Sequence, residues 1–415
     1  MQKMSQIYNR HKSKGFALGD QAVVSGSNFI FGIVVTRYAG LDTYGLFVMF
    51  WLVFLFMQGL FESFISLPNL VVSNSVENKK AYLRANERLA LWLSGINLMI
   101  LYIGFGIYSV FVSVEDLGYA FWLFPIVIVC FLKHETNRKY FFATENYLKA
   151  LVIDSVAYLL QLVVLLIWGQ FYPIDLGIIL SVLLINGILA NLLFYVMYDK
   201  EKTNLKLRAL PWKKNWDYAR FLLLTTILQW FSGNFLMASA GVILGTTSVG
   251  IIKIVQNLMG ILNVLFTTLE NVIPAKASFL LQKQGLQYYK RYIKKAATIS
   301  GVVFIVLLLA IFFSAEQLLD FVYGSDFSTY HPYLQLFTIL YLGVFVGTFL
   351  QLTIKTHGKN KWIFYAYVSS TIVSVCLAKP LIENFQIAGF IIGLMILQLI
   401  NILVYFFSLK SINHG

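Results

Sequence analysis

The stretch Phe16–Thr36, FALGDQAVVSGSNFIFGIVVT, decides the fold class of this chain. It is long enough for an α-helix to cross the roughly 30 Å hydrocarbon core of a bilayer, and its only charged residue is Asp20. Backbone N–H and C=O groups in lipid must find partners within the segment, so such a run forms a helix. We interpret it as a membrane span and not as a cleavable signal, because it is too long for a signal's apolar region.

Eleven further apolar runs of spanning length follow this one. A soluble domain carries about 25% charged residues because its surface faces water, whereas this chain is 12% charged and 59% hydrophobic. The sequence therefore predicts an all-α polytopic membrane protein of about twelve transmembrane helices and excludes a soluble fold. The expected spans are 16–36, 44–72, 89–112, 117–136, 150–168, 174–198, 221–244, 249–274, 296–318, 332–354, 362–378 and 388–409.

Basic residues are concentrated on one side of the predicted membrane. All of the 32 Lys and Arg residues except Arg37, Lys253 and Lys379 fall in the N-terminal tail, in every second connection after it, or at the C-terminal end. Lys and Arg accumulate on the cytoplasmic side of membrane proteins, so we predict that both termini are cytoplasmic. This distribution accounts for the net charge of +13 without a nucleic-acid partner. The connection after the fourth span contributes Lys133, Arg138, Lys139 and Lys149 to that side.

The sequence lacks the motifs of common enzyme classes. It has no GxxxxGK[ST] phosphate-binding loop, and its cysteines, Cys130 and Cys376, and its five histidines form no metal-ligand pair. Short outer loops argue against a polysaccharide polymerase, and the absence of a DxD-like acidic pair argues against a nucleotide-sugar transferase. We predict no enzyme activity, no catalytic residue, no cofactor and no bound metal.

Two parts of the chain resemble each other. Asn28 corresponds to Asn234 and Pro68 to Pro274 at an offset of 206, while Gly40 corresponds to Gly245 at 205. The matched segments are SGSNFIFG (25–32), AGLDTYG (39–45) and SLPN (66–69) in the first copy, and FSGNFLMA (231–238), LGTTSVG (244–250) and VIPA (272–275) in the second.

Six predicted spans separate the two copies, so both enter the membrane in the same orientation. The repeat predicts an N-terminal lobe at 1–198 and a C-terminal lobe at 219–415, joined by a cytoplasmic linker at 199–218. Each lobe would hold six helices, and the two parallel repeats would surround a central cavity, an arrangement that transporters use for alternating access.

Ionisable side chains within spans are costly and are therefore functional candidates. The candidate acids are Asp20, Glu62, Asp154 and Glu270, and the candidate cations are Arg37 and Lys253. Polar side chains accompany them: Gln21, Ser25 and Asn28 at helical spacing on the first span, Asn234 on the seventh, and Gln256 and Asn257 on the eighth. We expect these stripes to face the cavity, because lipid excludes them.

Structural explanations compete with these roles. Arg37 could only reach toward the outer headgroups, and Asp20 and Asp154 could only balance charges at helix ends. The amide and hydroxyl side chains could only form helix–helix hydrogen bonds, worth about 0.6 kcal/mol each. Lys253 and Glu62 lie several residues from either end of their spans and are harder to explain in this way.

Three segments resemble a known family: ALGDQAVVSGSNFIFGIVVTRYAGLDTYGLF (17–47), RKYFFATENYLKALVIDSVAYLLQL (138–162) and QWFSGNFLMASAGVILGTTSVGIIKIVQNLMGILNVLFTTLENVIP (229–274). They look like the polysaccharide-lipid flippases of the Wzx type, within the multidrug/oligosaccharidyl-lipid/polysaccharide exporter superfamily. The resemblance implies two six-helix lobes in the bacterial cytoplasmic membrane. It also implies that polyprenyl-diphosphate-linked oligosaccharides are moved to the outer leaflet for cell-surface polysaccharide biosynthesis, with a polysaccharide polymerase and chain-length proteins as further partners.

By this resemblance Arg37 and Lys253 would bind the diphosphate, and the polar stripes would line the glycan path. The four acids would bind H⁺ or Na⁺ for coupling. The alternatives are a cation-coupled drug or metabolite antiporter of the same superfamily, in which Glu62 would bind a cationic substrate, and a membrane polysaccharide polymerase.

Overall fold

A computed structural model describes residues 2–111, 117–198, 210–359 and 361–413. Every regular element in these ranges is a helix, which confirms the predicted all-α class. The elements are α1 (Gln2–Phe61), the π-helical turn η1 (Glu62–Ser66), α2 (Leu67–Leu70), η2 (Val72–Asn74), α3 (Lys79–Phe111), α4 (Gly118–Ala143), α5 (Tyr147–Phe171), α6 (Leu176–Met197), α7 (Trp212–Leu244), α8 (Thr246–Met259), η4 (Gly260–Leu262), α9 (Asn263–Lys283), α10 (Leu286–Phe313), α11 (Ala315–Tyr323), η5 (Ser325–Tyr330), α12 (His331–Thr356) and α13 (Lys361–Asn413).

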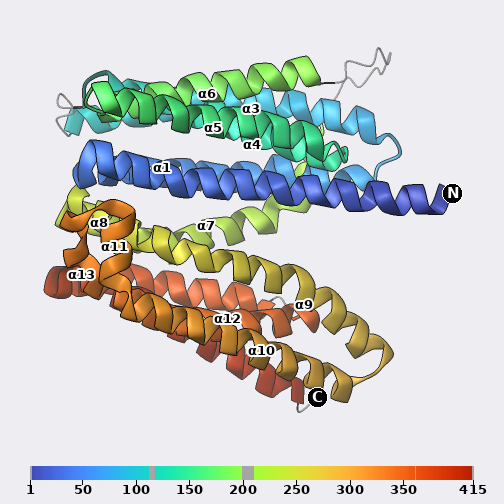
Figure 1. The fold of residues 1–415 in the computed structure, drawn as a ribbon. Coiled ribbons are helices and arrows are strands. Elements are labelled where there is room, and N and C mark those ends of the chain that lie inside the picture. Colours follow the sequence, from blue (N-terminus) through green and yellow to red (C-terminus); the bar gives the residue numbers. More distant parts are fainter. Residues whose placement is uncertain (1, 112–116, 199–209, 360, 414–415) are drawn as a thin grey trace. The chain divides into compact units, whose positions relative to one another are not determined.

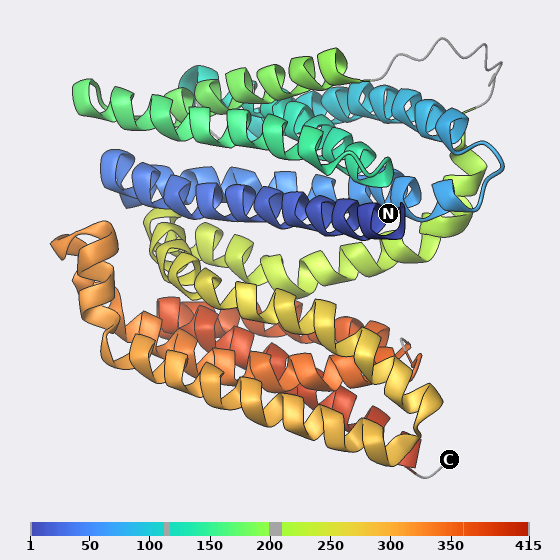
Figure 2. The same ribbon diagram turned by 45° about the vertical axis from the view of Figure 1, so that its right-hand side comes forward.

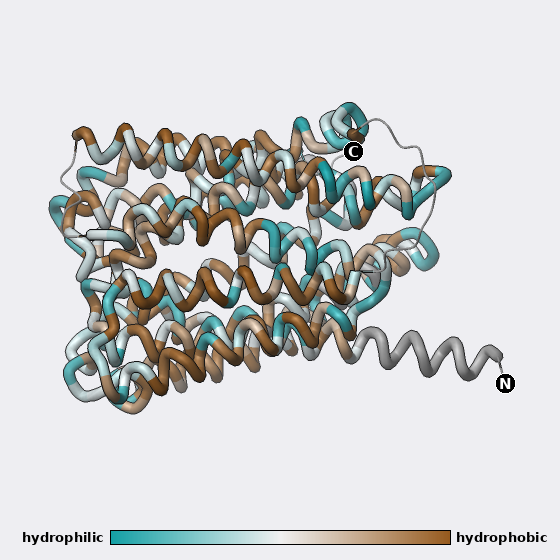
Figure 3. The backbone as a smooth tube through the Cα atoms, turned by 90° about the horizontal axis from the view of Figure 1, so that it is seen from above, coloured by the Kyte–Doolittle hydropathy of each residue, from teal (hydrophilic) through white to brown (hydrophobic). Residues whose placement is uncertain are grey.

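The helices account for the predicted spans. Nine helical segments in the described ranges are long and apolar enough to cross a membrane. α1 and α13 each contain one residue with non-helical backbone, Gly40 and Gln386, and each therefore supplies two spans. α8, η4 and α9 run consecutively through the predicted eighth span. Hydrophobic residues follow most of the helix length, while hydrophilic residues gather toward helix ends and turns (Figure 3).

The chain divides into two compact units, Met1–Ile227 (unit 1) and Leu228–Gly415 (unit 2). The division falls inside α7, so that the first part of this helix packs with unit 1. Most of the predicted linker, residues 199–209, lies outside the described residues. The lobe boundaries at 198 and 219 therefore remain a prediction.

In unit 1, α4 packs between α3 and α6, while α5 packs along α1 and also contacts α6 (Figure 1). The core around α4 is apolar, and Phe121, Phe124, Val127 and Ile128 are at most 1% exposed. The start of α3 and the turn between α4 and α5 lie at the same end of this unit (Figure 1). This packing brings α1, α4 and α5 together.

A buried amide network fastens the start of α7 to unit 1. The π-helical turn η1 interrupts the regular i→i−4 hydrogen bonds of the α-helix. There the carbonyls of Phe64 and Ile65 accept hydrogen bonds from side chains. Asn215 Nδ2 donates to Phe64 O at 2.8 Å, and Asn86 Nδ2 donates to Ile65 O at 2.9 Å. Asn215 Nδ2 also donates to Asn86 Oδ1 at 2.7 Å, and Tyr82 Oη donates to Asn215 Oδ1 at 2.6 Å.

In unit 2, α12 is the central helix and contacts α8, α9, α10 and α13. Phe304 and Phe337 are 2% exposed, and Leu334 is fully buried. The short helix α11 follows α10 and packs against η5 and α12. The turn between α9 and α10 and the C-terminal end of α13 lie at the same end of this unit (Figure 2).

The repeated glycines share one backbone conformation. Gly40 has φ 82° and ψ 171°, and Gly245 has φ 86° and ψ 172°. This region of φ/ψ space is essentially open to glycine alone. Each glycine separates the first two spans of its half, which agrees with the duplication inferred from the sequence.

Candidate functional site

Three helices of unit 1 bring four ionisable side chains together in its interior. Asp20 comes from α1, His134 and Arg138 from α4, and Asp154 from α5. Both aspartates are fully buried, and Arg138 is 8% exposed. His134 and Arg138 stand four residues apart, so that one face of α4 presents both. We call these four residues the charge cluster.

Arg138 holds the two aspartates. Its Nε lies 2.9 Å from Asp20 Oδ2 and 2.8 Å from Asp154 Oδ2, and its Nη2 lies 2.5 Å from Asp20 Oδ2. Leaving a carboxylate unpaired in such a site costs several kcal/mol, about 3–5 when one partner of a buried pair is removed. The pairing therefore explains how Asp20 and Asp154 are tolerated within predicted spans.

His134 gives the charge cluster a group that can change its charge. Its Nε2 lies 3.1 Å from Asp154 Oδ1, and the Glu135 carboxylate lies 3.6 Å from Arg138 Nη1. Three carboxylates thus surround one guanidinium, and a proton on His134 reduces the excess negative charge. A cavity of about 10 Å³, enough for about one water molecule, adjoins His134, Arg138 and Asp154.

The charge cluster is better suited to a proton than to a metal ion. Hard metal cations need about six oxygen ligands, and the guanidinium already engages both aspartates. Among the described residues, no group of three or more His, Cys, Asp or Glu side chains is placed to hold a metal.

A second buried ion pair lies on the same helix. Lys133 Nζ forms an ion pair with Glu87 of α3 and donates to Asn137 Oδ1 at 2.5 Å. Asn137 Nδ2 in turn donates to Asn191 Oδ1 of α6 at 2.9 Å. α4 therefore carries a buried polar stripe that ties it to α3 and α6 as well as to α1 and α5.

The interpretation of Lys133 and Arg138 as residues of an inner connection was wrong. α4 continues to Ala143, and both side chains are buried, at 6% and 8% exposure. The predicted span 117–136 stopped short of Arg138 and α4 continues to Ala143, because the sequence does not show that acids on other helices neutralise these two charges. The i, i+4 pairs Lys133/Asn137 and His134/Arg138, read with Asp20 and Asp154, are the signal that could have identified the charge cluster.

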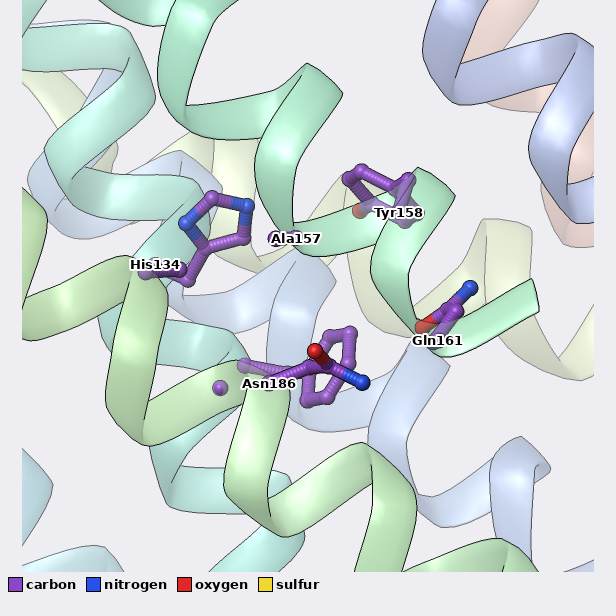
Figure 4. Close-up of a pocket in the computed structure, with 8 residues that line it drawn as sticks. His134, Ala157, Tyr158, Gln161 and Asn186 are labelled. Carbon is purple, nitrogen blue, oxygen red and sulfur yellow. The ribbon is translucent and has the colours of Figure 1, made fainter. Parts of the chain in front are cut away.

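A narrow gap lies beside the charge cluster. Figure 4 shows His134, Tyr158, Gln161 and Asn186 around it, and these residues come from α4, α5 and α6. The gap has no room for even one water molecule, so a sugar ring does not fit there. The charge cluster and its surroundings therefore have no room for a glycan.

The predicted polar stripe of α1 lies on the outside of unit 1. Gln21, Ser25 and Asn28 are exposed, and Gln21 Nε2 donates to Ser25 Oγ at 3.0 Å. Arg138 Nη2 donates to Gln21 Oε1 at 3.4 Å, so this stripe begins next to the charge cluster. Arg37 is exposed three residues before Gly40.

Glu62 is separate from the two aspartates. It is half-buried at the start of η1, and its carboxylate lies 3.4 Å from Lys139 Nζ. The structure thus brings two of the four predicted coupling acids together, Asp20 and Asp154, and leaves Glu62 in another ion pair. Glu270 is exposed on α9 of unit 2.

The predicted polar stripe of α8 is the least buried face of that helix. Lys253, Gln256 and Asn257 are half-buried, whereas Ile252, Ile254 and Val255 are fully buried. No acid in the described part of the chain lies within ion-pair distance of Lys253. Asn234 is half-buried on α7. α8 therefore presents a cation and two amides together on one face.

No family model matches this sequence. No curated protein matches it by sequence either.

Solved structures match nearly the whole chain. An inward-facing multidrug resistance MATE family transporter of the MOP superfamily gives a TM-score of 0.72 at 11% identity, covering 96% of this chain and 99% of that one. The lipid II flippase MurJ in an inward closed conformation gives 0.69 at 14% identity, covering 95% and 87%. A MOP superfamily transporter from Pyrococcus furiosus, described as having a binding pocket of reverse polarity, gives 0.59 at 12% identity, covering 97% and 95%.

This chain has the fold of MOP-superfamily transporters. The fold agrees with the superfamily expected from the sequence. It is shared by drug transporters and by a lipid flippase, so the fold alone does not select the substrate.

Proposed function

We propose that this protein is a flippase that moves polyprenyl-diphosphate-linked oligosaccharides from the inner to the outer leaflet by alternating access. It would act in cell-surface polysaccharide biosynthesis in the bacterial cytoplasmic membrane, with both termini in the cytoplasm. A polysaccharide polymerase and chain-length proteins would use its product. The two lobes would be residues 1–198 and 219–415.

We base this proposal on which charged side chains have a partner of opposite charge and which do not. Asp20 and Asp154 are paired with Arg138, and Glu62 is paired with Lys139, whereas Lys253 has no acidic partner among the described residues. Glu270 is the exposed exception. A site of this balance suits an anionic diphosphate better than the cationic substrate of a drug antiporter.

The polar stripes supply what the glycan needs. A sugar cannot cross hydrocarbon unaided, because each hydroxyl would lose its water partners at a cost of several kcal/mol. We assign Gln21, Ser25 and Asn28 of α1 to the glycan path, together with Asn234, Gln256 and Asn257 of unit 2. Arg37 and Lys253 would bind the diphosphate.

The charge cluster is our candidate for coupling to a proton gradient. His134 takes up or releases the proton. The change in its charge alters the ion pairs of Asp154 and Arg138, which lie in the same buried surroundings. Asp20 follows through its contacts with Arg138. Of the two coupling ions that the sequence left open, H⁺ and Na⁺, we therefore propose H⁺.

Complementation tests the function and the anion site together. A strain that lacks its lipid-linked-oligosaccharide flippase is supplied with wild type, Lys253→Ala, Arg37→Ala or Lys379→Ala at matched expression, and its surface glycan is measured. Lys379 is the matched control, because it is 76% exposed and pairs with Glu383 on its own helix. We expect wild type and Lys379→Ala to restore the glycan. With Lys253→Ala we expect the surface glycan to fall at least about tenfold, because this variant loses one charge-assisted hydrogen bond to the substrate.

The possible failures are distinct. Full rescue by Lys253→Ala and Arg37→Ala would reject the assignment of the anion site to these residues but would still support the flippase function. No rescue by a correctly inserted wild type in several glycan backgrounds would reject the flippase. Transport of cationic dyes that Glu62→Gln abolishes would establish the antiporter instead.

A further inference from the structure

The end of α9 and the start of α10 form the most basic surface of unit 2. Six cations lie between residues 276 and 295, and no Asp or Glu occurs from 271 to 315. All six are exposed, and none lies within ion-pair distance of an acid in the described part of the chain. We call this segment the basic hairpin; its cations are Lys276, Lys283, Lys290, Arg291, Lys294 and Lys295.

The basic hairpin is held firmly in place. Tyr289 is 3% exposed and packs with Ile273, Ala277 and Leu352. Its ring meets the His357 ring at 5.1 Å between centroids. The cations are therefore presented by a packed surface and not by a loose loop, so less conformational entropy is lost when a ligand binds.

The cations of α10 share one face of its first turns. Lys290, Arg291, Lys294 and Lys295 are exposed, while Tyr289 is buried and Tyr292 and Ile293 are half-buried on the other side. Lys276 of α9 lies over the Tyr292 ring at 5.1 Å. Tyrosines among basic residues are typical of a helix end at the headgroup level of a membrane.

The apolar run of α10 begins only after these residues. Residues 286–295 extend the helix by about 15 Å beyond the predicted span 296–318. The headgroup region is roughly 5–7 Å thick on each side, so this part of the helix passes through it. Its unneutralised cations then stand at the depth of lipid phosphates.

We propose that the basic hairpin is a docking surface for the anionic phospholipid headgroups of the leaflet that it faces. Lipid phosphates supply the negative charge that no acid in the described part of unit 2 provides, and the tyrosines anchor the hairpin at the same level. The buried cations of unit 1, Lys133 and Arg138, contrast with it because their partners lie inside the protein.

Lipid binding to the purified full-length protein tests this proposal. The protein in neutral detergent is titrated with phosphatidylglycerol or phosphatidylcholine of matched chains, and bound lipids are counted by native mass spectrometry. The test variant is Lys290→Gln/Arg291→Gln/Lys294→Gln. The control is Lys213→Gln/Lys214→Gln/Arg220→Gln, which removes the same charge from exposed residues of α7. Replacement of Lys290, Lys294 and Lys295 by Arg keeps the charge and checks that the segment still folds.

We expect wild type to prefer phosphatidylglycerol, and the test variant to lose that preference by about tenfold or more. The α7 control and the arginine variant should keep it, and added salt should weaken it. Retention by the test variant, or equal loss in the α7 control, would overturn the proposal. Binding of undecaprenyl diphosphate without any preference for phosphatidylglycerol would assign the hairpin to the transported lipid instead. None of these outcomes depends on the complementation result for Lys253.

Discussion

Arg138 is the residue on which the interior of unit 1 depends. Asp20 and Asp154 belong to different helices and contact the same guanidinium. Buried ion pairs of this kind add little over an apolar core, yet removing one partner is costly. Arg138 therefore fixes which faces of α1, α4 and α5 meet.

Replacement of Arg138 by Gln should destabilise the protein by about 3–5 kcal/mol, because two buried carboxylates lose the guanidinium with which they pair. Lys139→Gln should cost no more than about 1 kcal/mol, since its pair with Glu62 is partly exposed. Thermal unfolding in detergent measures both variants. Equal melting temperatures would contradict the role given to Arg138.

His134→Gln should remove the response of transport to a pH gradient, because the neutral amide cannot carry the proton beside Asp154. Proteoliposomes with a labelled polyprenyl-diphosphate oligosaccharide provide the measurement, under an imposed H⁺ or Na⁺ gradient. His331→Gln on α12 is the control and should behave like wild type. Transport driven by Na⁺ in wild type would refute proton coupling.

At the scale of elements, single residues set where helices bend. Gly40 and Gly245 create the same bend in the two halves. In α13 the bend is at Gln386, with φ 52°, and the backbone folds back close to Gly389. A Cβ atom on Gly389 would lie 2.0 Å from the carbonyl oxygen of Leu381.

Gly389→Ala should therefore destabilise unit 2 by about 1–3 kcal/mol, since a backbone atom blocks the new methyl group. Gly104→Ala on α3 is the matched control, because nothing lies within 4 Å of its Cβ position. That change should be neutral or stabilising by up to about 1 kcal/mol. The expression level and melting temperature of the two variants test this prediction. Similar falls in melting temperature for both would show that the bend at Gln386 does not cause the destabilisation.

At the scale of the whole molecule, the two units use basic residues differently. Unit 1 buries Lys133 and Arg138 with acids, while unit 2 exposes a row of cations on α9 and α10. The exposed cations contribute to the net charge of +13, whereas Glu87, Asp20 and Asp154 offset the two buried ones. Setting Lys133 and Arg138 apart leaves the predicted orientation unchanged, because nearly all of the other Lys and Arg residues still fall on the same predicted side.

Reporter fusions test the orientation. Green fluorescent protein joined to the C-terminus should fluoresce, because we expect that end in the cytoplasm. Alkaline phosphatase inserted in the turn Ser325–Tyr330 should be active, because we expect that turn outside. The opposite pattern of activities would invert the topology and place the basic hairpin on the outer leaflet.

The sequence by itself predicted the helical class, about twelve spans and the correspondence of Gly40 with Gly245, where the structure has its repeated bends. Those features are local, since a span needs only apolar length and internal hydrogen bonds, and a bend needs only a residue that tolerates its backbone angles. The tertiary structure alone decided that Arg138 joins Asp20 to Asp154 and that Lys133 pairs with Glu87. Which helices meet depends on packing across distant parts of the chain, and a buried charge reveals its partner only when those helices lie side by side.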